Sequence, residues 1–121
     1  MRRSSRVPII IILVLLFLAS CGKQYEAKSL VKDFVKANAT EEVNISSFSD
    51  LDSTRVISDS VLLALRENVK TDPMFRKGTQ LSAERKSRTL LYIRMRYLED
   101  TLELSKTFYF NTDLDGIVAF K

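Results

Sequence analysis

The sequence predicts an α+β domain in which helices pack on one face of an antiparallel sheet. Two segments place apolar residues three and four positions apart, as helices with one buried stripe do. Three later segments alternate apolar and polar residues, as strands with one buried face do. Only short turns separate these strands, and parallel neighbours need a crossover of about a dozen residues or more. Antiparallel pairing with helices on the sheet is therefore favoured.

The chain begins with the three parts of an export signal. Arg2, Arg3 and Arg6 provide positive charge, residues 7–19 are apolar, and small residues precede Cys21. Secretory signals need these parts in this order. Residues 1–20 are therefore predicted to be a signal peptide.

Leu18-Ala19-Ser20-Cys21 resembles the lipobox of bacterial lipoproteins. The resemblance implies cleavage between Ser20 and Cys21, diacylglyceryl attachment to the Cys21 sulfur, and acylation of the freed amine with a fatty acid such as palmitate. Each buried CH₂ group contributes about 0.8 kcal/mol to membrane anchoring, so several chains hold a protein stably. Gly22-Lys23-Gln24 has neither the acidic run of lipoproteins exported to the cell surface nor an aspartate at the second position after the cut. The resemblance thus favours an outer-membrane anchor facing the periplasm.

Two other interpretations of this segment stay open. One is an uncleaved transmembrane helix. Its apolar residues, at about 1.5 Å each, span roughly 20 Å. That is short of the roughly 30 Å hydrocarbon core, although bilayer thinning lets a short helix span at modest cost. The other is an ordinary secreted protein in which Cys21 is incidental.

Removal of residues 1–20 leaves 101 residues, enough for one domain. We expect a lipidated N-terminus and short tether at residues 21–26 and a single domain at 27–121. Three of the 19 basic residues lie in the signal, which leaves 16 against 15 acidic residues. This near-neutral balance gives no indication of nucleic-acid binding.

The composition argues against most catalytic chemistry. The chain has no histidine, and its one cysteine is assigned to the lipid. Disulfides, Ser-His-Asp or Cys-His centres and a typical zinc site then lack their residues. We therefore predict no enzyme, no cofactor and no metal. An enzyme would need a cleft that gathers buried Asp or Glu with Lys, Arg or Tyr.

The first half of the domain is predicted to hold two helices and two weak strands. Apolar spacing predicts a helix over 27–38, and short alternation predicts strands at 43–48 and 54–57. Ser58 or Ser60 is the candidate cap of the next helix. Its buried face is predicted from Val61, Leu62, Leu65 and Val69, widened by Leu63 and Ala64.

The second half is predicted to be mostly strand. Asp72-Pro73 resembles a helix start, with one turn ending at Gly78, and an exposed loop follows at 79–87. Alternation predicts strands over 89–97, 102–111 and 117–120. The turns between them lie at 99–101 and 113–116.

This order of elements resembles the cystatin-like and nuclear-transport-factor-like rolls, and residues 107–121 are similar to short lipoproteins of Bacteroidota. The resemblance implies a curved sheet with a possible ligand pocket. The candidate lining residues are Tyr92, Tyr97, Phe108 and Phe110. The alternative, which we favour, is that these aromatic residues are core.

Residues 111–117 resemble the first half of an EF-hand loop. The resemblance would give ligand roles to Asn111, Asp113, Asp115 and the Ile117 carbonyl. The bidentate glutamate would fall after Lys121, and a strand rather than a helix is predicted before the loop. We therefore favour a hairpin turn, since Asn, Asp and Gly suit one.

Basic residues concentrate between positions 66 and 96, where nine of them stand against three acidic residues. A patch of this sign fits an anionic partner such as lipid phosphates. Its candidate members are Arg85, Lys86, Arg88, Arg94 and Arg96. The favoured alternative is a solvated face paired with Glu99, Asp100 and Glu103.

These observations lead to one expected function and one alternative. We expect a lipid-anchored periplasmic protein that binds or supports another envelope component without catalysis. The alternative is a lipid-anchored carrier with a small-ligand pocket between sheet and helices. An apolar pocket above about 300 Å³ would favour the carrier, whereas a filled core with an exposed patch would favour partner binding.

Overall fold

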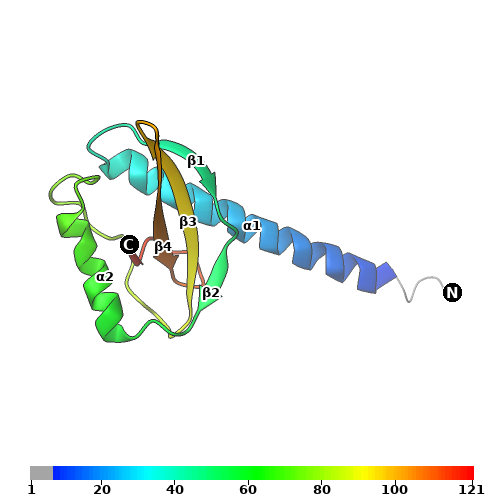
Figure 1. Cartoon of the computed structure of the whole chain (residues 1–121). Helices are drawn as coiled ribbons and strands as arrows, with labels where there is room; N and C mark the ends of the chain where they lie inside the picture. The colour runs from blue at the N-terminus through cyan, green and yellow to red at the C-terminus, as the bar shows by residue number, and fades with distance from the viewer. Residues whose placement is uncertain (1–6) are drawn as a thin grey trace.

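The computed structural model describes the backbone of residues 7–121 and the side chains of residues 22–121. The elements are α1 Val7–Asn38, β1 Asn44–Phe48, β2 Asp52–Thr54, α2 Asp59–Thr71, β3 Leu90–Glu99, β4 Leu102–Phe110 and β5 Ala119–Phe120. Two helices and a five-stranded antiparallel sheet confirm the predicted α+β class (Figure 1). The predicted cleavage site, Ser20 and Cys21, lies outside the described side chains.

The sheet is built around the β3–β4 hairpin. These two strands pair along their full length, from Leu91 opposite Phe110 to Glu99 opposite Leu102. β1 and β2 both pair with β3 on its other side, and β5 pairs with β4. Every pairing is antiparallel, and for β3–β4 and β4–β5 the short connections predicted this.

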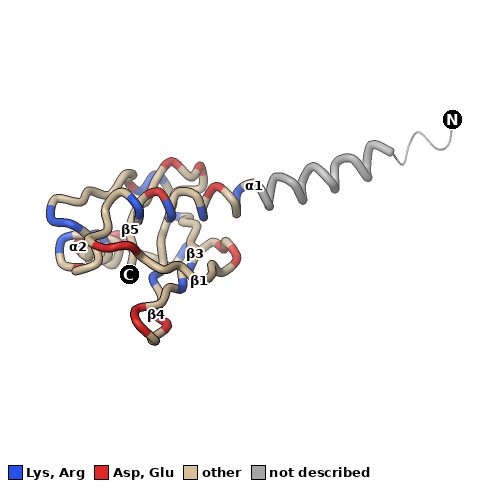
Figure 2. Tube along the Cα trace, turned by 90° about the horizontal axis from the view of Figure 1, so that it is seen from above, with Lys and Arg blue, Asp and Glu red and all other residues tan. Residues whose placement is uncertain are grey.

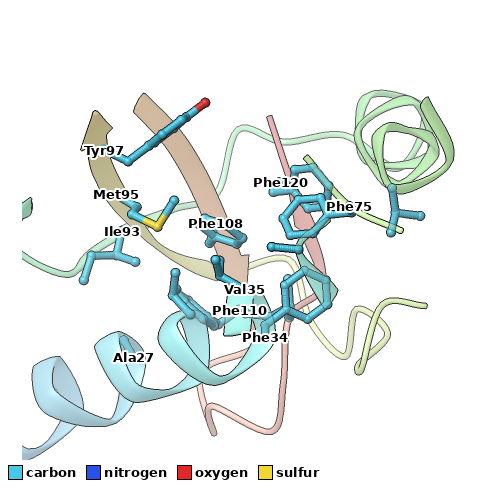
Figure 3. Packing of buried hydrophobic residues seen from close by; sticks show 14 of the residues in the cluster. Ala27, Phe34, Val35, Phe75, Ile93, Met95, Tyr97, Phe108, Phe110 and Phe120 are labelled. Carbon is cyan, nitrogen blue, oxygen red and sulfur yellow. The ribbon is translucent and has the colours of Figure 1, made fainter. Parts of the chain in front are cut away.

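The main core lies between α1 and one face of the sheet. Phe34 of α1 contacts Phe75, with ring centroids 5.3 Å apart, and lies near Phe108 at 6.4 Å. Phe120 joins the same cluster, 4.9 Å from Phe75 (Figure 3). The 27–38 spacing predicted this stripe, and Ala27, Val31, Phe34 and Val35 are all buried.

α2 lies along β5 at the edge of the sheet, beside the C-terminal strand in Figure 1. Arg66 donates a hydrogen bond to the Val118 carbonyl at 2.8 Å, and Asn68 donates one to the Phe120 carbonyl at 2.8 Å. Leu62 packs in a second cluster with Tyr109, whereas Val69 joins the main core. At this edge only one side of α2 is covered, so Val61 and Leu63 are exposed, contrary to the wide buried face predicted.

The predicted tether at residues 21–26 is helical in the structure and belongs to α1. Gln24 explains how this part of the helix is held. Its amide donates to the Ser49 carbonyl at 3.0 Å, and its side-chain oxygen accepts the Leu51 N–H at 2.5 Å. The prediction of a loose polar segment was wrong because these bonds link it to the loop between β1 and β2.

Two further local predictions were wrong because long-range pairing decides them. The second strand is Asp52–Thr54 rather than 54–57, since Asp52 pairs with Tyr92 of β3. Residues 72–78 do not form a helical turn. Asp72 instead ends α2, and Phe75 forms an isolated bridge with Ala39.

Candidate functional site

A groove of about 450 Å³ lies at one end of the domain. Its walls are the loop after α1 (residues 40–43), the loop after α2 (residues 72–74), and the tip half of the β3–β4 hairpin. In Figure 1 this hairpin tip lies beside the C-terminal end of α1. The groove therefore lies at the opposite end of α1 from the N-terminus of the chain.

An ion pair between Lys106 and Asp72 lies in the wall of the groove. The two side chains are only 12% and 16% exposed. The other Asp72 oxygen accepts the Met74 N–H at 2.9 Å, and the Lys106 ammonium lies 5.9 Å from the Tyr97 ring centre. The pair joins β4 to the end of α2, and its carboxylate has both oxygens engaged within the fold.

Tyr97 gives the groove a free polar group. The residue is 8% exposed and belongs to the main core, and it also lines the groove. Its hydroxyl has no hydrogen-bond partner among the side chains and backbone that the structure describes. Figure 3 shows the Tyr97 side chain at the edge of the cluster, beyond Met95 along β3. A ligand group in the groove can therefore donate to or accept from it.

Three leucines near the groove are exposed to solvent, and Leu98 lines the groove from the other face of the sheet than Leu102 and Leu104. Leu98, Leu102 and Leu104 are 38%, 66% and 36% exposed. Leu104 lies opposite Tyr97 in the β3–β4 ladder, and Leu102 lies opposite Glu99. Directly paired residues share a sheet face, so Leu102 and Leu104 extend the face that carries the Tyr97 ring.

Carboxylates surround this apolar border. Glu41, Glu42 and Glu99 line the groove. Asp100 and Glu103 are exposed at the hairpin tip, and Figure 2 shows acidic residues gathered there. Among the residues that line the groove, Lys106 is the single cation and is paired with Asp72. The groove and the hairpin tip therefore carry a net negative charge.

The predicted aromatic pocket does not form as one site. Phe108 and Phe110 are fully buried in the main core together with Tyr97. Tyr92 is on the opposite face of the sheet, 6.1 Å from the Tyr109 ring, because successive residues of a strand alternate between faces. Of the four residues, Tyr97 alone lines the groove.

The predicted basic patch is divided between two places. Arg85, Lys86 and Arg88 line a cavity of about 530 Å³ beside the start of α2. Arg85 is held there by the Asp59 carboxylate at 3.3 Å and by two backbone carbonyls. Arg94 and Arg96 lie on β3, on the sheet face opposite α1. The structure therefore does not bring the five residues into one surface.

A lysine occupies the space between the carboxylates of the predicted calcium loop. The Lys86 ammonium lies 2.7 Å from Asp113 and 2.9 Å from Asp115, and these carboxylates raise the pKa of Lys86 to about 12. Asn111 donates to Asp115 at 3.0 Å and to the Glu84 carbonyl at 2.7 Å. These bonds join the loop of residues 79–88 to the turn before β5.

Hydrogen bonds from Asn111 and Lys86 hold the pKa of Asp115 below its usual range. Within the described residues, no group of three or more acidic, cysteine or histidine side chains has a geometry that could hold a metal ion. In the same part of the chain, no helix combines the length and the apolar composition that a membrane span needs.

Comparisons of the chain with protein-family models, curated proteins and solved structures found no match.

Sequence reasoning missed the groove because its walls come from segments far apart in the chain. Lys106 and Asp72 are separated by 34 positions, and neither has a distinctive local pattern. The apolar side chains at 102 and 104 fall in a predicted strand and look like ordinary strand residues. One available signal was the acidic run around the predicted turn at 99–101, which was assigned instead to neutralising the basic patch.

Proposed function

We propose that this protein is a lipid-anchored periplasmic component of the cell envelope that binds another envelope component through the groove, without catalysis. The observation that carries the binding role is the exposed hairpin tip, where leucines and carboxylates border a groove with a free tyrosine hydroxyl. Exposed apolar residues gathered beside a groove are typical of an interaction site.

Partner binding fits the packing better than catalysis. The groove does gather Asp72, Lys106 and Tyr97, the residue types that an enzyme without histidine would need. However, the Asp72 carboxylate is already occupied by Lys106 and by the Met74 N–H. This pair acts as a clamp between α2 and β4, so the proposed role uses the groove for recognition.

The lipid anchor is proposed from the lipobox, and the geometry of α1 supports a defined orientation. Gln24, three positions after Cys21, is bonded to the loop between β1 and β2. The helix from residue 22 to Asn38 then rises about 24 Å, at about 1.5 Å per residue. A lipid on Cys21 would hold the domain close to the bilayer, with the groove at the far end.

Lipidation is tested by replacing Cys21 with serine. Cells that express the full chain are labelled with radioactive palmitate, and the protein is recovered and counted. We expect Cys21→Ser to lose the label, because serine lacks the sulfur that accepts diacylglycerol. Equal labelling of both proteins would overturn the lipoprotein proposal.

Partner binding at the hairpin tip is tested by site-specific photo-cross-linking in intact cells. A photoreactive phenylalanine analogue replaces Leu102, which is 66% exposed, or Leu63 of α2, which is 64% exposed and serves as the matched control. We expect a cross-linked product of defined mass from position 102 and none from position 63. Equal products at both positions, or none at 102, would contradict a binding role for this end.

A carrier role has one observation in its favour, the free Tyr97 hydroxyl in a groove larger than about 300 Å³. The filled aromatic core and the charged rim weigh against a pocket for an apolar ligand. Native mass spectrometry of the protein purified from cells separates the two roles. A bound small molecule that Tyr97→Phe releases would favour the carrier.

A further inference from the structure

The backbone of β4 has an open edge close to the groove. β3 pairs with β4 from Leu102 to Phe110, whereas β5 pairs only with Phe108 and Tyr109. Just beyond β5, Thr107 and Lys121 exchange two backbone hydrogen bonds of 2.9 and 3.0 Å. Within the part of the chain that the structure describes, no strand pairs with residues 102–106 on this side. Edge strands of this kind accept an added extended segment.

The two-residue repeat of a strand shows which groups face this open edge. The Tyr109 carbonyl accepts the Val118 N–H at 2.8 Å, so Tyr109 and Thr107 both direct their backbone groups toward the β5 side. Alternate residues of an antiparallel strand direct these groups the same way. The N–H and C=O groups of Ser105 and Glu103 therefore point to the open edge, while those of Leu104 point to β3.

The side chains beside this edge are suited to an added strand. Leu102 and Leu104 are exposed on the face that also carries Tyr97. Alternate side chains of an incoming strand would lie on this same face. Its apolar residues on this face would contact the two leucines, and the side chains between them would lie on the other face, which carries Glu103.

The charge around the edge selects the partner. Glu41, Glu42 and Glu99 line the groove, and Asp100 and Glu103 lie at the hairpin tip. Complementary charge favours a segment with lysine or arginine. A second copy of this chain is disfavoured, because pairing two β4 edges would bring the like charges of two hairpin tips together.

We propose that the open edge of β4, at Glu103 and Ser105, binds an extended basic peptide segment of the partner by strand addition. The segment alternates apolar residues, which contact Leu102 and Leu104, with lysine or arginine, which lies on the other face of the sheet and pairs with Glu103 there and with Asp100 at the hairpin tip. This inference rests on the proposed function, since it assumes that the hairpin tip is the binding end.

The test uses the full chain purified in detergent and a fluorescent peptide that alternates lysine with valine. Binding is measured by fluorescence anisotropy. We expect saturable binding that weakens as salt is raised, and no binding of a matched peptide that alternates glutamate with valine. Absence of lysine–valine binding, or equal binding of both peptides, would overturn the inference.

Ser105→Pro tests strand addition directly. Proline removes the N–H that points to the open edge, a position where edge strands accept proline. We expect Ser105→Pro to weaken binding about tenfold, as the loss of one hydrogen bond does. Ser105→Ala keeps the N–H and is the matched control, expected to bind within about twofold of the unsubstituted protein. Equal affinity of the two variants would contradict strand addition.

A second measurement keeps the test valid should Ser105→Pro fail to fold. A lysine–valine peptide that is N-methylated at alternate residues cannot donate to the β4 edge, and it is measured on the unsubstituted protein. We expect it to bind at least about tenfold more weakly than the parent peptide. Equal affinity of the methylated and parent peptides would mean that only charge holds the peptide, and this would overturn strand pairing.

The outcomes separate this inference from the proposed function. A cross-link from position 102 in cells, together with no peptide binding, would leave the binding role in place and remove the basic-strand partner. Self-association of the purified chain that Ser105→Pro abolishes would identify a second copy as the occupant, and this too would overturn the peptide. Peptide binding without a cross-link from position 102 in cells would support strand addition by a basic segment. It would contradict the proposal that an envelope component binds at this end.

Discussion

The two halves of β4 have the same alternation in sequence and opposite environments in the structure. Residues 102–105, the open half, are exposed, whereas residues 107–110, the covered half, are buried. Leu102 and Leu104 lie on the same face of the strand as Phe108 and Phe110, by the period-two rule. The difference comes from their neighbours: Phe34 of α1 and the β5 strand cover the second half only. Burial of β4 therefore depends on how far the neighbouring elements, α1 and β5, extend along it.

The largest expected effect comes from Phe108, in the covered half. Phe108→Ala removes a fully buried ring that contacts Phe34 and Phe120, so we expect a loss of about 3 to 5 kcal/mol in the free energy of unfolding. Urea denaturation measures it. Leu102→Ala, in the open half, is the control and should cost less than about 0.5 kcal/mol. Similar losses at both positions would remove the distinction between the two halves.

Gly116 sharpens the comparison at the covered end. A Cβ at this position would lie 2.7 Å from the Ser82 hydroxyl and 3.0 Å from its backbone, at a φ of +155°. We expect Gly116→Ala to lower the free energy of unfolding by about 2 to 3 kcal/mol, because the added Cβ would clash with Ser82 and the backbone conformation would be strained. Gly78, at φ +87° with nothing near its Cβ, is the control and should cost about 1 kcal/mol. Thermal unfolding compares them, and equal losses would contradict the close packing around Ser82.

The Lys106–Asp72 clamp lies where the two halves of β4 meet. Lys106→Met leaves the shielded Asp72 carboxylate without its cation, and we expect a loss of about 2 kcal/mol. Adding Asp72→Asn should recover part of this loss, because the unpaired charge is removed. Guanidinium denaturation of the single and double variants measures the coupling. If the losses of the two single variants simply add in the double variant, Lys106 and Asp72 do not stabilise each other.

Asp115 gives the smallest effect and one that depends on pH. Its folded pKa is lowered, so its contribution to stability is present above about pH 4 and is lost as pH falls through the folded pKa. We expect Asp115→Asn to cost less than about 1 kcal/mol at pH 7 and progressively less below pH 4. Thermal unfolding from pH 7 to pH 3 follows the difference. A cost that stays constant over this range would contradict the role of the ionised carboxylate.

Much of the fold could be predicted because local periodicity and burial agree in most elements. The spacing from Ala27 to Val35 predicted the buried stripe of α1, and alternation predicted β3 and β4 within two residues at each end. Ser58 was among the two predicted caps, and its hydroxyl accepts the Val61 N–H at 3.3 Å. The predictions failed at the edges, where Leu63 and Leu104 look like core residues but have no neighbouring element to cover them.

The candidate site was less predictable, since it depends on contacts between distant residues. The sequence placed Asp72 in a helix start and gave Lys106 no role, whereas folding brings the two together. Lys86 was assigned to an anionic-partner patch, and it instead pairs with the carboxylates of a turn 27 positions later. Such pairings are set by the register of the sheet and the path of the loops, and neither leaves a local pattern.

The contact between Phe34 and Phe120 has a consequence for biogenesis. Their rings lie 6.3 Å apart, so the core closes only when both ends of the domain are available. In a nascent chain that lacks β5, Phe34, Phe108 and Phe110 would be partly uncovered. Such a chain would bury less apolar surface, and its compact state would be less stable. Under the proposed export, the chain would therefore remain open to translocation until its last residues had been made.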